Sequence, residues 1–486
     1  MKKNFANILF RGTIAVSIAN AGAQFVGLLL LPTFTKYLSP KDFGIISMVS
    51  LVVTFLALLY NPGIMSATMR LYHSTESENE RKLLIGSAHR FFLFIPIIPL
   101  IICLIFGETL FSFIFKDFDF YPYGFLALLL AIFIQPSRMW STMMTLLYKI
   151  EKTALLTALS VVLGLISAII LVVVFKFGAM GRVLAMFVPA LFLYFISLYT
   201  VNKYTQGNWS FVNIKKQLIF GMPLIIGLWA YQGLNFVGKY FLEIFSNLEN
   251  VGLYTVGTTL ASVPLFLVLG FKQLWSPIFY ENMNKKDYEI ISKLISYFTV
   301  IISLLCLILI LFSKETIILL LDKEYYSIIP IIGFLLLASF FNGLLTISNT
   351  FLSFNNNFSR ISFFAVIATT VNIILNVLLI PYYGILGASI SLMLSYFIYY
   401  LLGAYSERKL IFQVQNKKSA FIPPILLVVG VVFNFNLNKY INLNDISFYE
   451  ILLKLSYFLV VVFIFFRIKL ISYGDLKNLY MKLTQK

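Results

Sequence analysis

Residues 42–64, DFGIISMVSLVVTFLALLYNPGI, contain an apolar run that is long enough to cross a lipid bilayer as one helix. A helix rises about 1.5 Å per residue and the hydrocarbon core is about 30 Å thick, so roughly 20 apolar residues make one crossing. Fourteen such runs, separated by loops too short for a soluble domain, lie at approximately 12–34, 43–64, 86–106, 122–148, 153–175, 181–202, 217–241, 251–273, 290–312, 328–352, 360–380, 384–404, 420–438 and 447–466.

The composition agrees with a chain that lies mostly in lipid. Of its 486 residues, 60% are hydrophobic and only 12% are charged, and the mean hydropathy is +0.91. Soluble domains are about 25% charged, so a globular enzyme and a disordered chain are excluded. The two cysteines lie in apolar runs, which excludes a disulfide scaffold. We predict an all-α polytopic membrane protein of about 14 transmembrane helices.

The basic residues indicate how the chain is oriented in the membrane. There are 37 Lys and Arg against 20 Asp and Glu, a net charge of +17. With the amino terminus inside, 26 of the 37 fall at cytoplasmic ends of runs, eight at outer ends, and three within runs, namely Arg138, Lys239 and Lys454. The positive-inside rule therefore predicts that both termini are cytoplasmic. It also explains the excess charge without nucleic acid, which we do not expect as a partner.

The chain contains an internal repeat. DFGIISMVS at 42–50 resembles NVGLYTVGT at 250–258, and GAMG at 178–181 matches GILG at 384–387, at offsets of 208 and 206. Apolar helices resemble one another by chance, so the argument depends on several positions keeping nearly one frame. Six helices per copy give two parallel repeats related by an axis along the membrane normal. The predicted divisions are a six-helix lobe at 1–203, a linker at 204–216, a second six-helix lobe at 217–406, and two extra helices with a basic tail at 407–486.

Several kinds of chemistry find no candidate residues in the sequence. There is no GxxxxGK[ST] phosphate loop, and neither His73 nor His89 has Cys or carboxylate neighbours at metal-ligand spacing. We therefore expect no cofactor and no metal site. All 20 acidic residues lie in loops or at the ends of runs, whereas ion-coupled carriers commonly bury a carboxylate in mid-membrane. Asp117 and Asp119 are candidates for an outer catalytic pair, but a solvated loop is the plainer interpretation, and we predict no catalytic residue.

One cation is predicted at mid-membrane depth. Gln135, Arg138, Thr142 and Thr145 follow one another at steps of three and four, which places them along one helix face. Arg138 precedes Lys149, at the cytoplasmic end, by about 16 Å of helix. An arginine at this depth costs about 2.5–3.5 kcal/mol, and no carboxylate is predicted nearby. Its partner is then water, helix carbonyls or a ligand from outside, and the guanidinium fork suits a phosphate or diphosphate.

Further polar side chains form stripes on other predicted helices. An offset of 204 maps the stripe that contains Arg138 onto Ser339, Asn342, Thr346 and Asn349. Interhelical hydrogen bonding, worth about 0.6 kcal/mol each, is the alternative interpretation of any one of these residues. Lys239 can also pair with Glu243, four residues later. Polar faces at corresponding places in both halves favour a hydrated lumen, and its remaining candidate residues are Asn20, Gln24, Gln232, Asn235, Asn372 and Asn376.

Three segments resemble a known family. They are SIANAGAQFVGLLLLPTFTKYLSPKDFGIISMV from residue 17, FGMPLIIGLWAYQGLNFVGKYFLEIFSNLENVGLYTVGTTLASVPLF from residue 220, and PYYGILGASISLMLSYFI from residue 381. They are similar to polysaccharide-biosynthesis flippases, the O-antigen and capsule exporters of the multidrug/oligosaccharidyl-lipid/polysaccharide (MOP) superfamily. The resemblance runs along nearly all of the chain, and the turn from Leu38 to Gly44 and the Gly384 to Gly387 segment are typical of the family.

The resemblance implies two MATE-like lobes that face each other across a cationic cavity. The implied activity is transport, not enzymatic catalysis. An undecaprenyl-diphosphate-linked oligosaccharide would cross from the cytoplasmic to the outer leaflet of a bacterial inner membrane by alternating access. Arg138, with Lys239 as a second cation, would hold the diphosphate, and the Asn, Gln and Thr stripes would bind the sugars. A polysaccharide polymerase and glycosyltransferases of the same pathway are the implied partners.

Two other functions remain open at this point. A multidrug-type exporter of the same fold that carries organic cations should place a carboxylate in its cavity, and the sequence offers none. A membrane glycosyltransferase or polymerase that acts on a lipid-linked sugar should need an outer catalytic loop, for which Asp117 and Asp119 are the only candidates.

Overall fold

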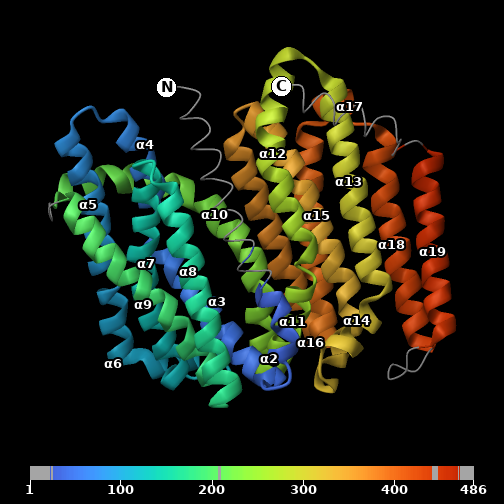
Figure 1. Ribbon diagram of the computed structural model, residues 1–486, viewed down its shortest axis with the longest axis horizontal. Coiled ribbons are helices and arrows are strands. Elements are labelled where there is room, and N and C mark those ends of the chain that lie inside the picture. The colour runs from blue at the N-terminus through green and yellow to red at the C-terminus, as the bar shows by residue number, and fades with distance from the viewer. Residues whose placement is uncertain (1–21, 23–25, 206–208, 441–446, 469, 471–486) are drawn as a thin grey trace. The chain divides into compact units, whose positions relative to one another are not determined.

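The computed structural model describes residues 22, 26–205, 209–440, 447–468 and 470 of the chain (Figure 1). The secondary structure of this part consists of helices and turns without strands, as predicted for the all-α class. The helices pack into two compact units. Unit 1 takes the chain up to Gln232 together with Lys239–Thr255, and unit 2 takes Gly233–Gly238 and the chain from Val256 onward. The four sequence divisions at 1–203, 204–216, 217–406 and 407–486 stay predictions.

Unit 1 carries the first half of the helices. They are α2 (Leu31–Phe34), α3 (Pro40–Tyr60), α4 (Ile64–Ser74), α5 (Glu78–Phe94), α6 (Ile97–Ile114), η1 (Phe120–Gly124), α7 (Phe125–Leu146), α8 (Ile150–Ala168), η2 (Ile169–Val174), α9 (Gly178–Thr205), most of α10 (Phe211–Phe245) and the first part of α11 (Leu248–Leu260).

Unit 2 carries the remaining helices. They are α12 (Val263–Lys285), α13 (Tyr288–Leu311), α14 (Ser313–Leu320), η3 (Lys323–Ile328), α15 (Ile329–Phe354), α16 (Phe358–Ser406), α17 (Arg408–Val414), α18 (Lys417–Tyr440) and α19 (Phe448–Arg467).

The described residues contain eleven helices that are long and apolar enough to cross a membrane, or twelve if the two parts of α10 count as one span. At 49 residues, α16 is about 74 Å of helix, more than two bilayer crossings need. It reverses at Gly384, and the Asn372 side chain donates to Ser395 Oγ at 3.0 Å across the two arms. Thus α16 is a hairpin. The predicted run at 12–34 lies largely outside the described residues, and the count of about fourteen stays a prediction.

The two repeat motifs with paired glycines form equivalent turns. Gly178 and Gly384 both have a positive φ, 57° and 51°, which side-chain-bearing residues rarely adopt. Three residues later, a Cβ on Gly181 would come within 2.8 Å of the Leu171 carbonyl oxygen, and a Cβ on Gly387 within 2.6 Å of the Leu379 carbonyl oxygen. The matching sequences at offset 206 therefore make matching turns, in agreement with two repeats.

The other repeated segment begins α3. Ser39 Oγ accepts the Asp42 amide at 3.2 Å while Asp42 Oδ2 accepts the Ser39 amide at 2.9 Å, a capping box with Pro40 in the first turn. Asp42 Oδ1 also accepts from the Ala179 amide at 3.3 Å. The start of α3 is thereby joined to the glycine turn that begins α9.

Within unit 1, α3 contacts α11 through equivalent residues of the repeat. A Cβ on Gly44 would overlap the carbonyl oxygen of Leu248, and a Cβ on Gly252 would overlap the carbonyl oxygen of Pro40. Thr255 Oγ1 donates to Ser47 Oγ at 2.8 Å, and these two residues are 208 apart in the chain. Reciprocal contacts of this kind are what a local two-fold axis produces. The two helices approach so closely that only glycine fits at both positions.

We expect Gly252→Ala to lower the thermal stability of the purified protein, because the added methyl group forces α3 and α11 apart. Overpacking of this kind typically costs about 1–3 kcal/mol. Gly270→Ala on α12 is the matched control, since a Cβ there would meet no atom within 4 Å. Alanine also favours a helix over glycine, so this control should unfold no earlier than the wild type. Equal melting temperatures for the two variants would contradict the close approach.

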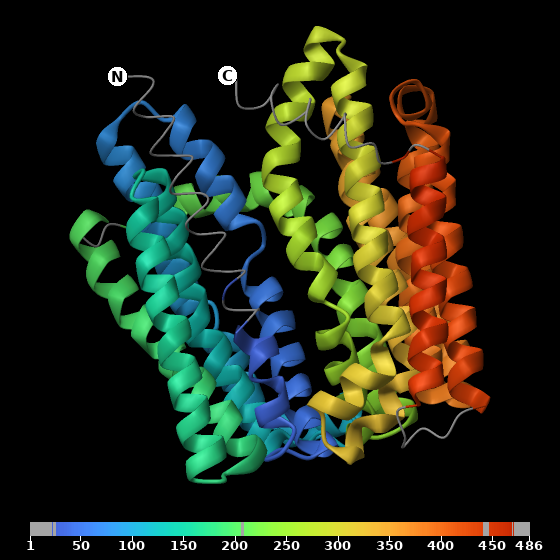
Figure 2. The same cartoon turned by 45° about the vertical axis from the view of Figure 1, so that its right-hand side comes forward.

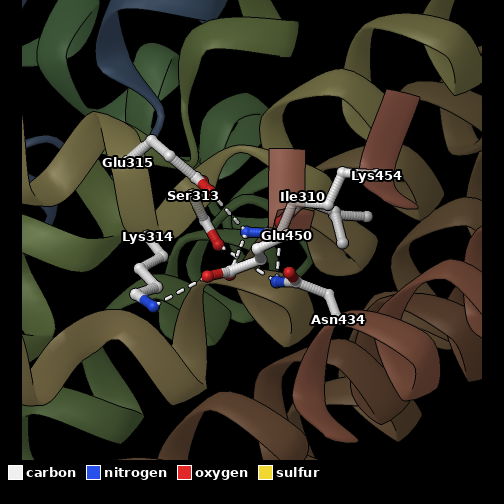
Figure 3. Close-up of polar contacts among 7 residues, drawn as sticks. All are labelled: Ile310, Ser313, Lys314, Glu315, Asn434, Glu450 and Lys454. Atoms are coloured by element: carbon white, nitrogen blue, oxygen red, sulfur yellow. Dashed lines mark hydrogen bonds and ion pairs between the residues drawn. The ribbon is translucent and has the colours of Figure 1, made fainter. Parts of the chain in front are cut away.

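Unit 2 contains a buried ionic cluster that the sequence interpretation did not anticipate (Figure 3). Lys314 Nζ lies 2.9 Å from Glu450 Oε2, and Lys454 Nζ lies 2.6 Å from Glu450 Oε1 and 2.7 Å from Glu315 Oε1. The side chains of Lys314, Glu450 and Lys454 are fully buried. We call these four residues the Lys–Glu quartet. Its long-range partners are 136 and 139 residues apart, so local sequence patterns do not reveal it.

The quartet and a neighbouring asparagine attach α19 and α18 to the rest of unit 2. Glu450 and Lys454 come from α19, and Lys314 and Glu315 from α14. From α18, the Asn434 side chain donates to the Ile310 carbonyl oxygen at 2.8 Å and to Ser313 Oγ at 3.2 Å. Figure 2 shows α18 and α19 side by side in this unit, where Tyr457 donates to the Leu426 carbonyl oxygen.

Glu450→Gln should destabilise the protein by about 3–5 kcal/mol, because it leaves two buried lysines with one carboxylate. The double variant Lys314→Met/Glu450→Leu removes one charge of each sign and should recover most of that loss, since apolar replacement of a buried pair is often nearly neutral. The measurement is thermal unfolding in detergent. Glu281→Gln is the control, because its pair with Lys285 is exposed and worth about 0–1 kcal/mol. A double variant as unstable as Glu450→Gln would contradict this account.

Candidate substrate-binding cavity

A cavity of about 610 Å³ lies among α7, α8 and α9 of unit 1, and we call it the Arg138 cavity. Arg138, Thr142 and Thr145 of the predicted stripe all line it. Figure 1 shows these three helices packed side by side, and Ser167 of α8 donates to the Ala185 carbonyl oxygen of α9. The remaining lining residues are Met69, Ile134, Ser137, Ser141, Ile150, Thr153, Thr157, Met186, Pro189, Ala190 and Leu193.

The guanidinium of Arg138 has no ion pair or hydrogen bond with any residue in the described part of the chain, and none of the cavity-lining residues is acidic. Its backbone carbonyl oxygen accepts the Thr142 hydroxyl at 3.2 Å, while the side chain itself is exposed. A guanidinium presents five N–H donors in a planar fork that matches carboxylate and phosphate oxygens. The cavity therefore provides an anion site whose charge the protein does not neutralise.

Toward a ligand, three hydroxyl groups of the cavity act mainly as hydrogen-bond acceptors, because their protons are already donated to the backbone. Ser137, Thr142 and Thr145 donate their protons to carbonyl oxygens of their own helix, at 2.7, 3.2 and 3.0 Å. Each hydroxyl oxygen keeps lone pairs that can accept from a ligand. Thr153, from α8, is buried, and its hydroxyl has no partner in the described part of the chain. Methionine, proline, alanine and leucine side chains from α4 and α9 supply an apolar wall.

Four of the cavity's polar residues were not predicted from the sequence. Ser137 and Ser141 lie beside the stripe on α7, and Thr153 and Thr157 lie one turn apart on α8. The signal that could have found the last two is their spacing of four residues, which places both on one face of the next helix. Nothing in the sequence shows which face of α8 packs toward Arg138.

Gln135 does not line the cavity, although the stripe included it. It is fully buried, and its Nε2 donates to the Ala57 carbonyl oxygen at 2.5 Å, which joins α7 to α3. Ser339, its counterpart at offset 204, donates to the Ala261 carbonyl oxygen at 2.6 Å. Since Ala261 is the counterpart of Ala57 at the same offset, both repeats make the same bond. At this position the structure has the interhelical hydrogen bond that was the alternative interpretation.

The pair between Lys239 and Glu243, which was the alternative interpretation of Lys239, is not formed. Glu243 is fully buried, and its Oε1 accepts the backbone amides of Lys116, Asp117 and Phe118 at 2.7, 2.6 and 3.1 Å. Three amides converge on Oε1 and hold it without an ammonium group, whereas Oε2 is buried and has no hydrogen-bond partner in the described part of the chain. Lys239 is half-buried and has no ion-pair partner in the described part of the chain. It lies outside the Arg138 cavity.

None of the other candidate residues that the structure describes lines the Arg138 cavity. Asn372 and Asn376 are buried inside unit 2, where Asn376 Nδ2 donates to the Asn372 carbonyl oxygen at 2.7 Å. Asn235 accepts the Tyr396 hydroxyl at 3.3 Å. Gln232, Asn342, Thr346 and Asn349 are half-buried. Asn20 and Gln24 lie outside the described residues. Substrate binding by this set stays a prediction.

Other ionisable clusters do not alter this choice of site. The Lys–Glu quartet is neutral as a whole and closed to solvent. Within the described residues, no group of three or more His, Cys, Asp or Glu side chains is arranged to hold a metal ion.

Comparison with known proteins identifies the family. Residues 9–283, more than half of the chain, match the model of the polysaccharide biosynthesis protein family, and the chain belongs to this family. An uncharacterized membrane protein of Methanocaldococcus jannaschii is 24% identical over 335 residues, which cover 66% of this chain and 61% of that protein. The match thus spans about three fifths of the length of that relative.

Solved structures share the fold. The lipid II flippase MurJ in an inward closed conformation superimposes with a TM-score of 0.74 at 17% identity, over 93% of this chain and 99% of that one. An inward-facing multidrug resistance MATE transporter of the MOP superfamily gives 0.62 at 13% identity, over 81% and 98%. The protein is therefore a multi-pass integral membrane protein with the MurJ/MATE-like fold, and the predicted relation to the polysaccharide-biosynthesis family is confirmed.

Accessibility of single cysteines will test the geometry of the Arg138 cavity. In a variant without Cys103 and Cys306, we expect Thr142→Cys to react with a water-soluble thiol reagent about tenfold faster than Met143→Cys, or more. The reason is that Thr142 lines the cavity, whereas Met143, the next residue on α7, is 0% exposed. Similar labelling rates at the two positions would show that water does not reach this face of α7.

Proposed function

We propose that this protein is a flippase for an undecaprenyl-diphosphate-linked oligosaccharide. It moves this cargo from the cytoplasmic to the outer leaflet by alternating access, for the synthesis of O-antigen, capsule or a related surface polysaccharide. The observation that carries the proposal is the Arg138 cavity, where an unneutralised guanidinium faces hydroxyl groups and no acid. The family and the fold support the same conclusion, because both are those of transporters of this superfamily.

In this proposal Arg138 binds the diphosphate. A charge-assisted bidentate contact is stronger than a neutral hydrogen bond, and it repays the cost of holding the guanidinium within the membrane. Lys239, which is also without an ion-pair partner in the described part of the chain, is the second candidate cation.

The hydroxyl groups fit the remainder of the cargo. Sugar hydroxyls donate as readily as they accept, so the lone pairs of Ser137, Thr142 and Thr145 are suitable partners. The unpartnered hydroxyl of Thr153 provides another contact within the same cavity. Acceptors of this kind do not discriminate strongly among sugars. This suits a carrier that recognises its cargo mainly by the diphosphate. The prenyl chain would stay in the lipid beside the protein.

The proposed setting is the bacterial inner membrane, with both termini in the cytoplasm. The distribution of Lys and Arg supports this orientation. A polymerase and glycosyltransferases that make and extend the oligosaccharide are the proposed partners. An exporter of organic cations is disfavoured, because the cavity is lined by a cation and lacks a carboxylate.

Arg138→Ala should abolish surface polysaccharide in a strain whose own flippase gene is deleted, while the protein remains in the membrane at its normal level. The loss of a charge-assisted contact of about 1.5–3 kcal/mol weakens binding about 10- to 150-fold. Arg138→Lys should rescue transport only in part, because an ammonium group lacks the planar fork. Surface glycan is measured by immunoblot and the membrane level by an epitope tag.

Two control variants accompany the substitutions of Arg138. Lys152→Ala removes an exposed charge at the start of α8, outside the cavity, and should leave the glycan unchanged. Asp117→Asn with Asp119→Asn should also have no effect. If that double variant shortened the polymer while translocation stayed intact, the glycosyltransferase or polymerase function would be favoured. Wild-type glycan in Arg138→Ala would remove Arg138 from the mechanism.

A further inference from the structure

A second cavity, of about 460 Å³, lies where the two ends of the α16 hairpin meet the start of α17. Because α16 reverses at Gly384, Arg360 in its first turn lies next to Ser406, its last residue. Arg408 is the first residue of α17. Lys409 lines the same cavity. We call this cavity the basic pocket, and its other lining residues are Asn355, Tyr405, Glu407, Leu410 and Gln413.

The arginines of the basic pocket are held by neutral groups. Arg360 Nη1 donates to Ser406 Oγ at 3.0 Å, and the Arg408 guanidinium lies 4.3 Å from the centre of the Tyr405 ring. In the part of the chain that the structure describes, no ion pair neutralises either arginine or Lys409. Both guanidinium groups are thus positioned and still have N–H donors available to an anion.

The one carboxylate that lines the basic pocket already accepts hydrogen bonds from amide groups. Glu407 is 7% exposed, and its two oxygens accept the side-chain amides of Asn355 and Asn357 at 2.5 and 3.0 Å. It pairs with amides and not with the arginines. Three cations and one carboxylate leave the pocket with an excess of positive charge.

Large apolar side chains are exposed on the helices that form the basic pocket. Phe358 in the first turn of α16 is 57% exposed, Phe412 on α17 is 52% exposed, and Tyr405 is 68% exposed. Aromatic side chains in such places are typical of the membrane–water interface. Tyr405 also lines the pocket, so a ligand that bears both a phosphate and an acyl chain would contact the arginines and this ring together, whereas a free phosphate would contact only the arginines.

We propose that the basic pocket binds the phosphate headgroup of an anionic phospholipid. Basic pockets between transmembrane helices are known to bind anionic headgroups at the cytoplasmic surface, and the positive-inside pattern predicts that Arg360, Arg408 and Lys409 lie on that side. The pocket belongs to unit 2 and shares no residue with the Arg138 cavity of unit 1. It is therefore a separate site, and it does not depend on the proposed function.

Lipid binding to the full-length protein will test this site. Native mass spectrometry can compare the affinity for phosphatidylglycerol with that for phosphatidylcholine. For Arg360→Gln/Arg408→Gln, we expect affinity for phosphatidylglycerol to fall about 10- to 30-fold, with little change for phosphatidylcholine. Lys417→Gln/Lys418→Gln removes the same charge from exposed positions at the start of α18, outside the pocket, and should keep most of the affinity. Thermal unfolding confirms that both variants fold.

Competition with inorganic phosphate distinguishes the two sources of a phosphate ligand. If the headgroup is bound together with its chains, millimolar phosphate should not displace phosphatidylglycerol. Displacement at that concentration would assign the pocket to a free phosphate and overturn the lipid proposal. Two further results would also overturn it: unchanged affinity in the arginine variant, or an equal loss in the lysine control, which would mean general charge attraction without a defined site.

Discussion

Lipid hydrocarbon offers no hydrogen-bond partner to a peptide group, and this constraint shapes each part of the protein. Helices satisfy the backbone internally, and where a helix ends or turns, the chain supplies its own partners. Glu243 collects three amides beyond the end of α6, Asp42 binds amides at the starts of α3 and α9, and Gly384 allows α16 to reverse. Polar side chains are therefore used first to complete the fold, and only what remains is available for a ligand.

Comparison of the two repeats distinguishes the polar residues that complete the fold from those that are available for a ligand. Structural features recur in both halves: the positive-φ glycines at 178 and 384, the reciprocal contacts of Gly44 and Gly252, and the bonds that Gln135 and Ser339 make to equivalent alanines. The cation does not recur, because Arg138 has an asparagine as its counterpart at offset 204. At this position the duplicated scaffold thus carries a charge in one half only, which is what a site for a single anionic group requires.

Much of the fold can be predicted from the sequence, because the length of an apolar run determines whether that run can cross the bilayer as a helix. The stripe of Arg138, Thr142 and Thr145 could be predicted as well, since helical periodicity determines which residues share a face. Gln135 shows the limit of that argument, because its direction depends on where the Ala57 carbonyl oxygen lies. The same holds for Thr153 and for the Lys–Glu quartet, whose partners come from distant helices. Periodicity gives the face of a helix, and tertiary packing decides what that face contacts.

The Lys–Glu quartet has a consequence for the biogenesis of the protein. A ribosome makes Lys314 and Glu315 more than a hundred residues before Glu450 and Lys454, their partners in the mature chain. During that interval the charges of α14 must remain hydrated or be held by the insertion machinery, because lipid does not solvate them. Unit 2 is complete only when its last helix leaves the ribosome, so assembly of this half finishes after translation of α19 and not helix by helix.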